Sequence, residues 1–434
     1  MYRSGGGMLP PRSSRLPRTG VNLGAGDDGE GPGRTVATLP DVQVRDSLVR
    51  EHVVVVGAGL AGGRSVEELR AQGHQGRITL VGAEAHLPYD RPPLSKAVLL
   101  GRLDDTALDI PFERLDVEVL TGVPATGLRP GTLQTEAGEL PYDGLVLATG
   151  ARARELPGAR VLRTVDDALA LRARLRPGAR VVVVGAGWIG AEVATAAAAA
   201  GCATTVLEAD AAPLAGALGE DVGALTVPWY AAAGVELHLH AQVEAVEPDR
   251  VVLADGRTLP ADVVVVGIGA RPDTDWLQGS GLALDGGVLV DEHLAASWPD
   301  VVAVGDCAAW WSLRFGVRLR VQHWDDALHG PVAAVATLLG RPAVHDPVPY
   351  FWSDQLGHLL QHAGHADGAD AVVQRGVPGA ADGWSTCYLR DGRLVAVLAV
   401  DRPRDLVQGR RRIAAADAAD PARLADPAVP LRSA

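Results

Sequence analysis

The stretch "VVVVGAGLAG" (residues 53–62) decides the fold, because the chain contains it twice. The second copy, "VVVVGAGWIG" (residues 181–190), agrees with the first at eight of ten positions. In each copy an apolar run is followed by the pattern GxGxxG and then by a segment of helical character. A buried strand, a glycine turn and a helix in this order are typical of dinucleotide binding. The repeat therefore predicts two dinucleotide-binding turns in one chain.

The three glycines of each turn have separate expected roles. The first permits the tight turn, the second lets the backbone approach a pyrophosphate, and the third lets the helix pack closely on the strand. The free N–H groups of the following helix would then face the phosphates. These glycines are Gly57, Gly59 and Gly62 in the first turn and Gly185, Gly187 and Gly190 in the second.

Each turn is followed by an acidic residue where the next strand is expected to end. Glu84 follows Gly57 by 27 residues and Glu208 follows Gly185 by 23, close to the ~20 expected of a carboxylate that binds ribose hydroxyls. Glu208 would repel the 2′-phosphate of NADPH, and the next residues, "ADAAPLAGALGE", contain no arginine to receive it. We therefore expect NADH. The alternative is that Glu208 only faces solvent at a strand end.

Composition limits the class of protein. The chain has 434 residues, 47% of them hydrophobic, and a formal net charge of −13; this length suggests about two to four domains. The charge disfavours nucleic-acid and anionic-membrane binding, and no apolar run approaches the ~20 residues of a membrane helix. Three distant cysteines without CxxC spacing predict the reduced thiols of a cytoplasmic protein. Residues 1–50, rich in Gly, Pro, Arg and Ser, predict a disordered extension.

The loop "LPYDRPPLSK" (residues 87–96) is stiff and charged. Because Pro88, Pro92 and Pro93 fix φ and restrict their neighbours, they predict an extended, rigid segment rather than a helix. Such a segment would hold Lys96 in place. The alternative is an exposed lysine with a loose surface partner, since lysines are mostly exposed.

Three later segments predict buried strands that end in Gly or Asp: "YDGLVLATG", "ADVVVVGIGARPD" and "WPDVVAVGDCA". Together with the two glycine turns, these segments resemble the two-dinucleotide flavoprotein disulfide-reductase superfamily. "PYDRPPLSK" and "FWSDQ" (residues 351–355) are similar to its ferredoxin-reductase branch, and the resemblance covers about residues 51–434.

The resemblance implies an α/β fold with FAD on the first turn and NADH on the second. Two Rossmann-like domains would be followed by a C-terminal α+β interface domain. The expected ranges are 51–157 and 286–340 for a discontinuous FAD-binding domain, 158–285 for the NAD-binding domain and 345–434 for the C-terminal domain.

The resemblance also implies site residues. Asp306 would accept from the ribityl chain of the flavin, and the helix after it would point its N-terminus at the pyrophosphate; a carboxylate opening a helix could equally be an N-cap. The expected FAD-binding residues are Gly57, Gly59, Leu60, Ala61, Gly62, Glu84, Arg91, Lys96, Val123, Ala148, Thr149, Gly150, Arg163, Asp306 and Trp324. The expected NAD-binding residues are Gly185, Gly187, Trp188, Ile189, Gly190, Glu192, Glu208, Gly267, Ile268, Gly269 and Trp352.

By the same resemblance, Lys96 and Glu192 form an ion pair beside the flavin and are the expected catalytic residues. A fixed cation there would stabilise the anion that develops when hydride arrives. Trp324 would offer a backbone donor to a flavin carbonyl, and Gln322 stands where relatives often carry glutamate. Trp352 would border the nicotinamide pocket, although a core tryptophan is an alternative.

The loop of residues 87–100 contains no cysteine, which disfavours dithiol chemistry. The resemblance then implies transfer of single electrons to a [2Fe–2S] ferredoxin that serves a haem monooxygenase or a ring-hydroxylating dioxygenase. Direct reduction of oxygen, a quinone or another small acceptor is an alternative, and so is an NADH-sensing role like that of apoptosis-inducing factor. Five arginines near the C-terminus could steer an acidic ferredoxin, or could form a solvated helix face: Arg402, Arg404, Arg410, Arg411 and Arg412.

Overall fold

The computed structural model describes residues 50–434, so the disorder expected of residues 1–49 lies outside the described part. At residue 50 the expectation is wrong. Arg50 is buried, lies 2.7 Å from Asp300 and donates to the carbonyl of Leu338 at 2.6 Å. No helix within residues 50–434 has the length and apolar character that crossing a bilayer requires.

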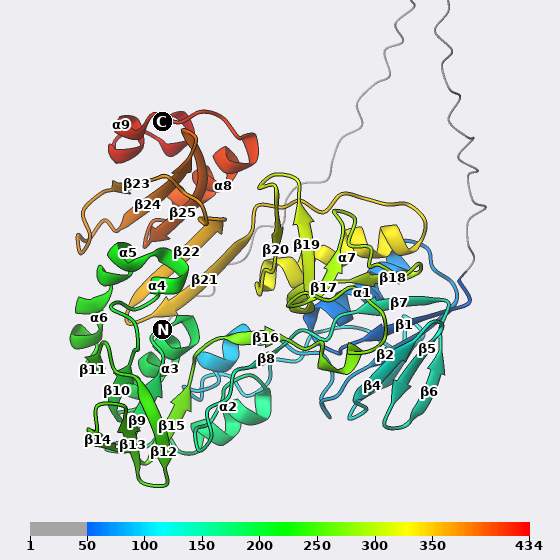
Figure 1. The fold of residues 1–434 in the computed structure, drawn as a ribbon, viewed down its shortest axis with the longest axis horizontal. Coiled ribbons are helices and arrows are strands. Elements are labelled where there is room, and N and C mark those ends of the chain that lie inside the picture. Colours follow the sequence, from blue (N-terminus) through cyan, green and yellow to red (C-terminus); the bar gives the residue numbers. More distant parts are fainter. Residues whose placement is uncertain (1–49) are drawn as a thin grey trace, which may run out of the picture. The chain divides into compact units, whose positions relative to one another are not determined.

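The first glycine turn belongs to a five-stranded parallel sheet with the strand order β18-β7-β1-β2-β3 (Figure 1). The central valines Val53, Val54 and Val55 are fully buried, as expected for parallel strands that are covered on both faces. Helices α1 (Leu60–Ala71) and α7 (Trp324–Leu338) pack against each other beside this sheet. The strands are β1 (His52–Val56), β2 (Arg77–Val81), β3 (Val117–Leu120), β7 (Gly144–Leu147) and β18 (Val301–Ala303).

The second glycine turn belongs to a four-stranded parallel sheet with the order β11-β10-β9-β15. Helix α3 (Trp188–Ala199) follows β9, as α1 follows β1. Its strands are β9 (Arg180–Val184), β10 (Ala203–Leu207), β11 (Val235–His238) and β15 (Val263–Val266). Between β10 and β11 the chain forms α4 (Ala215–Leu218), α5 (Glu220–Ala224) and α6 (Val227–Ala232).

The sequence repeat extends to the topology, because each parallel sheet receives its next strand after a three-stranded antiparallel meander. The meander before β7 consists of β4 (Ala125–Arg129), β5 (Thr132–Thr135) and β6 (Gly138–Pro141), and the one before β15 consists of β12 (Val243–Glu247), β13 (Arg250–Leu253) and β14 (Thr258–Pro260). After these meanders, β8 (Ala151–Ala153) and β16 (Ala270–Pro272) pair antiparallel and connect the two halves.

Smaller elements complete these halves. Helix α2 (Val165–Arg172) begins with a capping box in which Thr164 and Asp167 bond each other's backbone amides. A 3₁₀ helix, η2 (Asp275–Leu277), follows β16, and a separate sheet contains β17 (Val288–Val290), β19 (Ala308–Ser312) and β20 (Val317–Leu319).

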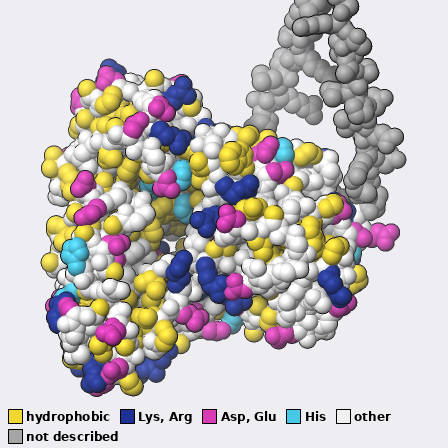
Figure 2. Space-filling model, viewed as in Figure 1, with side chains coloured by type: hydrophobic (Ala, Val, Ile, Leu, Met, Phe, Trp, Pro, Cys, Tyr) yellow, Lys and Arg dark blue, Asp and Glu magenta, His cyan; other side chains and the backbone are white. Residues whose placement is uncertain are grey.

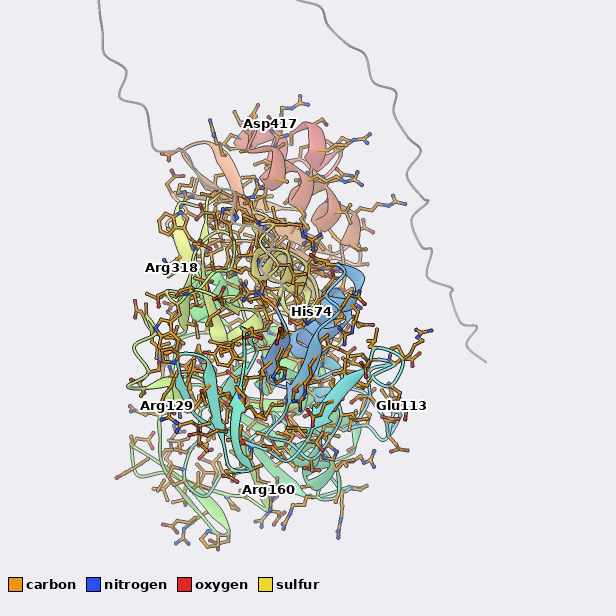
Figure 3. All side chains as sticks on the ribbon, turned by 90° about the vertical axis from the view of Figure 1, so that its right-hand side faces the viewer. His74, Glu113, Arg129, Arg160, Arg318 and Asp417 are labelled. Atoms are coloured by element: carbon orange, nitrogen blue, oxygen red, sulfur yellow. The ribbon has the colours of Figure 1, made fainter. Side chains whose placement is uncertain are left out.

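The C-terminal part is a five-stranded antiparallel sheet with the order β21-β22-β25-β24-β23, against which helix α8 packs. In Figure 3, Asp417 beyond α8 and Arg160 beside β15 lie at opposite ends of the view, with His74 between them. The elements are β21 (Tyr350–Gln355), β22 (His358–Gly364), β23 (Ala371–Arg375), β24 (Trp384–Arg390), β25 (Arg393–Val400), α8 (Pro403–Ala415), α9 (Pro421–Ala425) and the 3₁₀ helix η4 (Leu431–Ser433).

Two local expectations are wrong. The proline loop is not extended throughout, because Pro92–Ser95 forms a 3₁₀ helix, η1, with proline in its first turn. Proline suits that position, since its fixed φ matches the helix and its missing N–H would be unbonded there anyway. No helix follows Asp306: that residue lies in a 3₁₀ turn, η3 (Gly305–Cys307), and strand β19 comes next. The run "AAWWS" pairs with β17 and β20 and buries Trp310, as aromatic residues favour strands.

Candidate functional site

The first glycine turn has the shape of a phosphate cradle. Gly57 has φ +109°, and a Cβ there would collide with the carbonyl of Ala148, while a Cβ on Gly62 would collide with the carbonyl of Gly57. A Cβ on Gly59, in contrast, would meet no protein atom within 4 Å. Helix α1 begins directly after Gly59 without a side-chain cap or an acidic residue in its first turn. Its first N–H groups are thus available to an anion, and this turn fits the pyrophosphate of a dinucleotide.

The second turn repeats this geometry. A Cβ on Gly185 would crowd the carbonyl of Gly267, and one on Gly190 would collide with the carbonyl of Gly185. Helix α3 begins after Gly187, again with no side-chain cap and no acid in its first turn. In both turns the third position must be glycine mainly because a side chain there would collide with the carbonyl of the first glycine. Close packing of the helix on the strand is the lesser reason.

Glu208 lies just past β10 and is directed at the second turn. Its Oε2 accepts from the amide of Ala186 at 2.6 Å, and its Oε1 accepts from the amide of Asp210 at 3.0 Å. The structure therefore contradicts the alternative in which the Glu208 carboxylate only faces solvent. Held at the turn, Glu208 stands where ribose hydroxyls of a bound dinucleotide could donate to it.

Four of the residues expected to bind FAD form a connected polar chain. Glu84 Oε1 lies 2.6 Å from Arg91 Nη2, Arg91 Nη1 donates to the carbonyl of Arg163 at 2.7 Å, and Arg163 Nη2 lies 2.8 Å from Asp306 Oδ2. The Asp306 carboxylate pairs with an arginine and caps no helix, which excludes the N-cap alternative. These contacts bring the ends of β2 and β18 together with the proline loop.

Tyr89 belongs to the same polar chain, although nothing in the sequence spacing indicates it. Its hydroxyl donates to Glu84 Oε2 at 2.5 Å and accepts from Arg91 Nη1 at 3.0 Å and from the amide of Val165 at 3.2 Å. Burial raises the pKa of the Tyr89 phenol far above its usual value, so the hydroxyl stays protonated and keeps its donor role. A phenol buried beside a carboxylate and a guanidinium fixes the orientation of both.

The expected pair between the proline loop and helix α3 is present. Lys96 Nζ lies 2.8 Å from Glu192 Oε2, and the side chain of Glu192 is 3% exposed while that of Lys96 is 22% exposed. Ser95 Oγ donates to the same Oε2, and Ser353 Oγ donates to Oε1 at 2.5 Å. Neither serine is among the expected site residues: Ser95 adjoins Lys96 in the proline loop, and no sequence spacing links Ser353 of β21 to the glycine turns. The carboxylate is thus bound by three donors from two further segments of the chain.

Lys96 is also the single lysine of this chain, in which every other basic side chain of the Lys and Arg class is arginine. An ammonium is a compact point charge with three donors, whereas a guanidinium is a planar fork. The single lysine therefore supplies a compact, half-buried cation as the partner of the buried Glu192.

Aromatic side chains gather where β21 approaches helices α3 and α7. Trp324, the first residue of α7, donates from Nε1 to Asp90 Oδ1 at 2.7 Å. Trp352 lies with its ring centroid 5.8 Å from that of Trp324, while Phe351, on the other face of the strand, lies 4.7 Å from Trp188. The aromatic residue in contact with the second turn is thus Phe351, and Trp352 packs toward the beginning of α7.

The remaining expected residues lie at the carboxyl ends of the two parallel sheets. Ile189 and Ile268 are 42% and 44% exposed beside the second turn, so both side chains are accessible to a bound nucleotide. Thr149 donates to the carbonyl of Asp273 at 2.7 Å, and Gln322 is exposed. The others follow strand ends or begin helices: Leu60, Ala61, Val123, Ala148, Gly150, Gly267 and Gly269.

The five arginines of the C-terminal part do not form one free patch. Arg402 lies 2.8 Å from Asp405, and Arg412 donates to the carbonyls of Arg432 and Ala418. Arg410 reaches Asp325 of α7 at 2.6 Å. Among the described residues, Arg404 and Arg411 are exposed and have no ion-pair partner.

Two open glycine turns, each with a carboxylate at the adjoining strand end, define a two-dinucleotide oxidoreductase. Comparison with known proteins agrees: residues 51–330 match the family model described as pyridine nucleotide-disulphide oxidoreductase, and residues 350–434 match the model described as reductase C-terminal. The chain belongs to the pyridine nucleotide-disulphide oxidoreductase family, whose members bind FAD.

Similar proteins extend over most of the chain. It is 39% identical over 393 residues to the ferredoxin reductase component of chlorobenzene dioxygenase from Cupriavidus sp. (strain PS12), covering 86% of this chain and 95% of that protein. The solved structure of Fdr9 has a TM-score of 0.84 at 50% identity and covers 88% of this chain and 99% of its own. Putidaredoxin reductase in its covalent complex with putidaredoxin has a TM-score of 0.85 at 34% identity, covering 88% and 97%.

Proposed function

We propose that the protein is an FAD-dependent NADH:ferredoxin oxidoreductase. The observation that carries this proposal is the ion pair between the half-buried Lys96 and the buried Glu192, which joins the loop after the first dinucleotide turn to the helix of the second. FAD, when bound, accepts a hydride from NADH and releases its two electrons one at a time. The residues of this chain bind, orient and electrostatically support the two nucleotides.

The first turn, with Glu84, Arg91, Arg163 and Asp306, is the proposed FAD site. The open N-terminus of α1 would hold the pyrophosphate, and the carboxylates would accept from ribose and ribityl hydroxyls. Arg91 and Arg163 pair with these carboxylates and keep them in place. The proposed FAD-binding domain around this site is discontinuous and comprises residues 51–157 and 286–340. The proposed NAD-binding domain around the second turn comprises residues 158–285.

The second turn is the proposed NADH site. Glu208 would accept from the adenosine ribose, and its negative charge disfavours the 2′-phosphate of NADPH. Lys96 would place a fixed positive charge beside the flavin, where negative charge develops as the hydride arrives. Since the carbonyl of Pro92 in η1 and the carboxylate of Glu192 already bind the ammonium, little reorganisation is needed during transfer.

The proposed acceptor is a [2Fe–2S] ferredoxin that serves a dioxygenase or a haem monooxygenase. The relative from Cupriavidus is a ferredoxin reductase component of a dioxygenase, which supports this class of partner. Cys202, Cys307 and Cys387 are buried and free, and burial raises the pKa of the Cys387 thiol to about 12. Such thiols are poor nucleophiles, so electrons would leave for an external acceptor. Free cysteines also support a reducing compartment such as the cytoplasm.

Steady-state turnover with NADH tests the function directly. With a panel of [2Fe–2S] ferredoxins, at least one should accelerate NADH oxidation well above the rate with oxygen or a quinone as acceptor. Rapid reduction of the flavin by NADH without acceleration by any ferredoxin would favour a small-acceptor reductase instead. Absence of flavin reduction by NADH would contradict the proposal altogether.

The exposed arginines of α8 are the proposed steering charges for an acidic ferredoxin. Basic side chains also gather beside the central hollow of the face shown in Figure 2. Arg404→Glu with Arg411→Glu should raise the KM for ferredoxin and reduce its dependence on salt, while reduction of a neutral dye stays unchanged. Arg174→Glu with Arg176→Glu is the matched control, because these two exposed arginines just after α2 have no ion-pair partner among the described residues and their reversal changes the net charge by the same amount. Equal effects from both changes would point to net charge rather than to α8.

A further inference from the structure

The carboxylate of Glu192 is bound unequally at its two oxygens. Oε2 receives two donors, Lys96 Nζ and Ser95 Oγ, both from the proline loop. Among the described residues, Oε1 receives one side-chain donor, the hydroxyl of Ser353 in β21 at 2.5 Å. The loop thus fixes one oxygen of the carboxylate, and the C-terminal sheet fixes the other.

Burial strengthens the hydrogen bond between Ser353 and Glu192. Ser353 is 1% exposed and Glu192 is 4% exposed, and a hydrogen bond to an ionised group is stronger and more specific where water is excluded. The side-chain amide of Gln355, also buried, donates from Nε2 to Ser353 Oγ at 3.4 Å. Because the serine oxygen is accepting from Gln355, its own hydrogen remains available for Glu192. A short relay, Gln355 to Ser353 to Glu192, therefore orients the carboxylate.

We propose that Ser353 is a positioning residue for the reaction of NADH. By holding Oε1, it sets the plane of the Glu192 carboxylate and hence the place of the Lys96 ammonium, so that the C-terminal domain takes part in shaping the site of hydride transfer. This inference rests on the proposed function, in which the Lys96–Glu192 pair lies beside the reacting rings.

The same two elements share a second hydrogen bond that provides a matched control. The amide of Leu356, just after β21, donates to Thr195 Oγ1 of α3 at 2.8 Å. Thr195→Val removes this tie between α3 and the C-terminal sheet without touching Glu192. An effect through docking of the sheet should appear in Thr195→Val, whereas an effect through Glu192 should not.

The experiment compares Ser353→Ala, Ser353→Thr and Thr195→Val with the wild type, each loaded with FAD. Stopped-flow reduction at saturating NADH should slow on the order of tenfold in Ser353→Ala, as expected when a charged group loses one hydrogen bond. The apparent Kd for NADH should change little. Ser353→Thr, which retains a hydroxyl, should restore most of the rate, and Thr195→Val should react like the wild type.

A second readout is independent of turnover. Because Lys96 is the single lysine, reductive methylation with ¹³C-formaldehyde gives one lysine NMR signal, which reports on the surroundings of that ammonium. The signal should shift in Ser353→Ala and stay in place in Thr195→Val. Unfolding curves of all variants show whether the fold is retained.

Specific outcomes overturn the inference. A wild-type reduction rate and an unshifted Lys96 signal in Ser353→Ala would show that Glu192 needs no second anchor. Equal slowing in Thr195→Val would assign the effect to docking of the sheet. Failure of the wild type itself to be reduced by NADH would reject the proposed function, and the NMR comparison would still decide whether Ser353 orients the pair.

Discussion

The carboxylate of Glu208 accepts a hydrogen bond from the amide of Ala186 at 2.6 Å, so the acid beyond β10 is fixed against the second glycine turn. The first turn differs, since Glu84 pairs with Arg91 and Tyr89 instead of with the turn itself. The two halves of the repeat share their glycines and strands but hold their acids differently. This difference fits two nucleotides with separate roles, one resident and one exchanged in each turnover.

Nicotinamide preference should depend on Glu208. Wild-type enzyme should show a higher kcat/KM for NADH than for NADPH, and Glu208→Ala combined with Ala209→Arg should narrow that preference. The substitution removes the charge that repels the 2′-phosphate and supplies one that binds it. Ala209 is exposed, so the arginine can be accommodated. A preference that is unchanged in the double variant would make Glu208 a structural brace of the turn.

Gly59 and Gly57 should respond differently to alanine. At Gly59 a Cβ has open space and φ is negative, whereas at Gly57 it collides with the Ala148 carbonyl at a positive φ. Gly59→Ala should fold normally yet retain less FAD after gel filtration, because the methyl group stands where the pyrophosphate approaches. Gly57→Ala should lower the melting temperature or prevent folding. Full FAD retention by Gly59→Ala would remove the first turn from the proposed cofactor site.

Much of this arrangement can be predicted from sequence, because repeated local patterns encode it. The runs that end at Gly57 and Gly185 specify both strand and turn, and the structure has β1 and β9 there. The strand β19 after Asp306 could not be predicted in this way, since the pairing of its residues with β17 and β20 decides it. Sequence alone does not distinguish η1 from an extended loop, because proline is favoured both in a first helical turn and in extended segments.

The parts of the site that sequence does not reveal are those supplied by side chains far apart in the chain. Ser353 contacts Glu192 only because β21 packs on α3, and Tyr89 contacts Glu84 only because the proline loop folds back. A serine or a tyrosine in such a place carries no spacing that marks it. The family resemblance indicates the Lys96–Glu192 pair, whereas only the structure reveals the two serine hydroxyls that also donate to Glu192.

A buried histidine predicts how stability depends on pH. Burial lowers the pKa of His362 to about 3, with His323 and His365 adding smaller effects, and neither ring nitrogen has a partner within residues 50–434. Because the folded pKa lies below the usual 6.5, the unfolded chain binds more protons between these values. The free energy of unfolding should therefore fall as pH decreases from 6.5 toward 3, by about 1.4 kcal/mol per pH unit.

His362→Phe should remove this contribution, since Phe351 lies 5.3 Å away and accepts an aromatic neighbour. Urea unfolding at a series of pH values should then show a shallower loss of stability in acid for the variant. His329→Phe, at an exposed position, should keep the wild-type slope. Parallel curves for His362→Phe and the wild type would mean that His362 is hydrated or protonated in the folded state.

Replacing Lys96 tests the pair at the centre of the proposed function. Lys96→Met should slow reduction of the flavin by NADH about 30- to 1000-fold, the ~2–4 kcal/mol expected of a preorganised charge near a developing anion. Lys96→Arg should recover only part of that rate, because a planar guanidinium cannot take the place of a compact ammonium between Glu192 and η1. FAD content should stay near the wild-type value in both variants, whereas Lys96→Met should lower the melting temperature, because it leaves the buried Glu192 carboxylate without its counter-ion.

Glu192→Gln should impair the same step and also alter NADH binding, since Glu192 belongs to the helix of the second turn. If Lys96 and Glu192 act as one unit, the double variant Lys96→Met with Glu192→Gln should lose less than the product of the two single losses. Stopped-flow rates of the four enzymes give this coupling directly. Strictly multiplicative losses would show that the two groups act independently, and a Lys96→Met enzyme with the wild-type rate and full FAD content would leave the proline loop a purely structural brace.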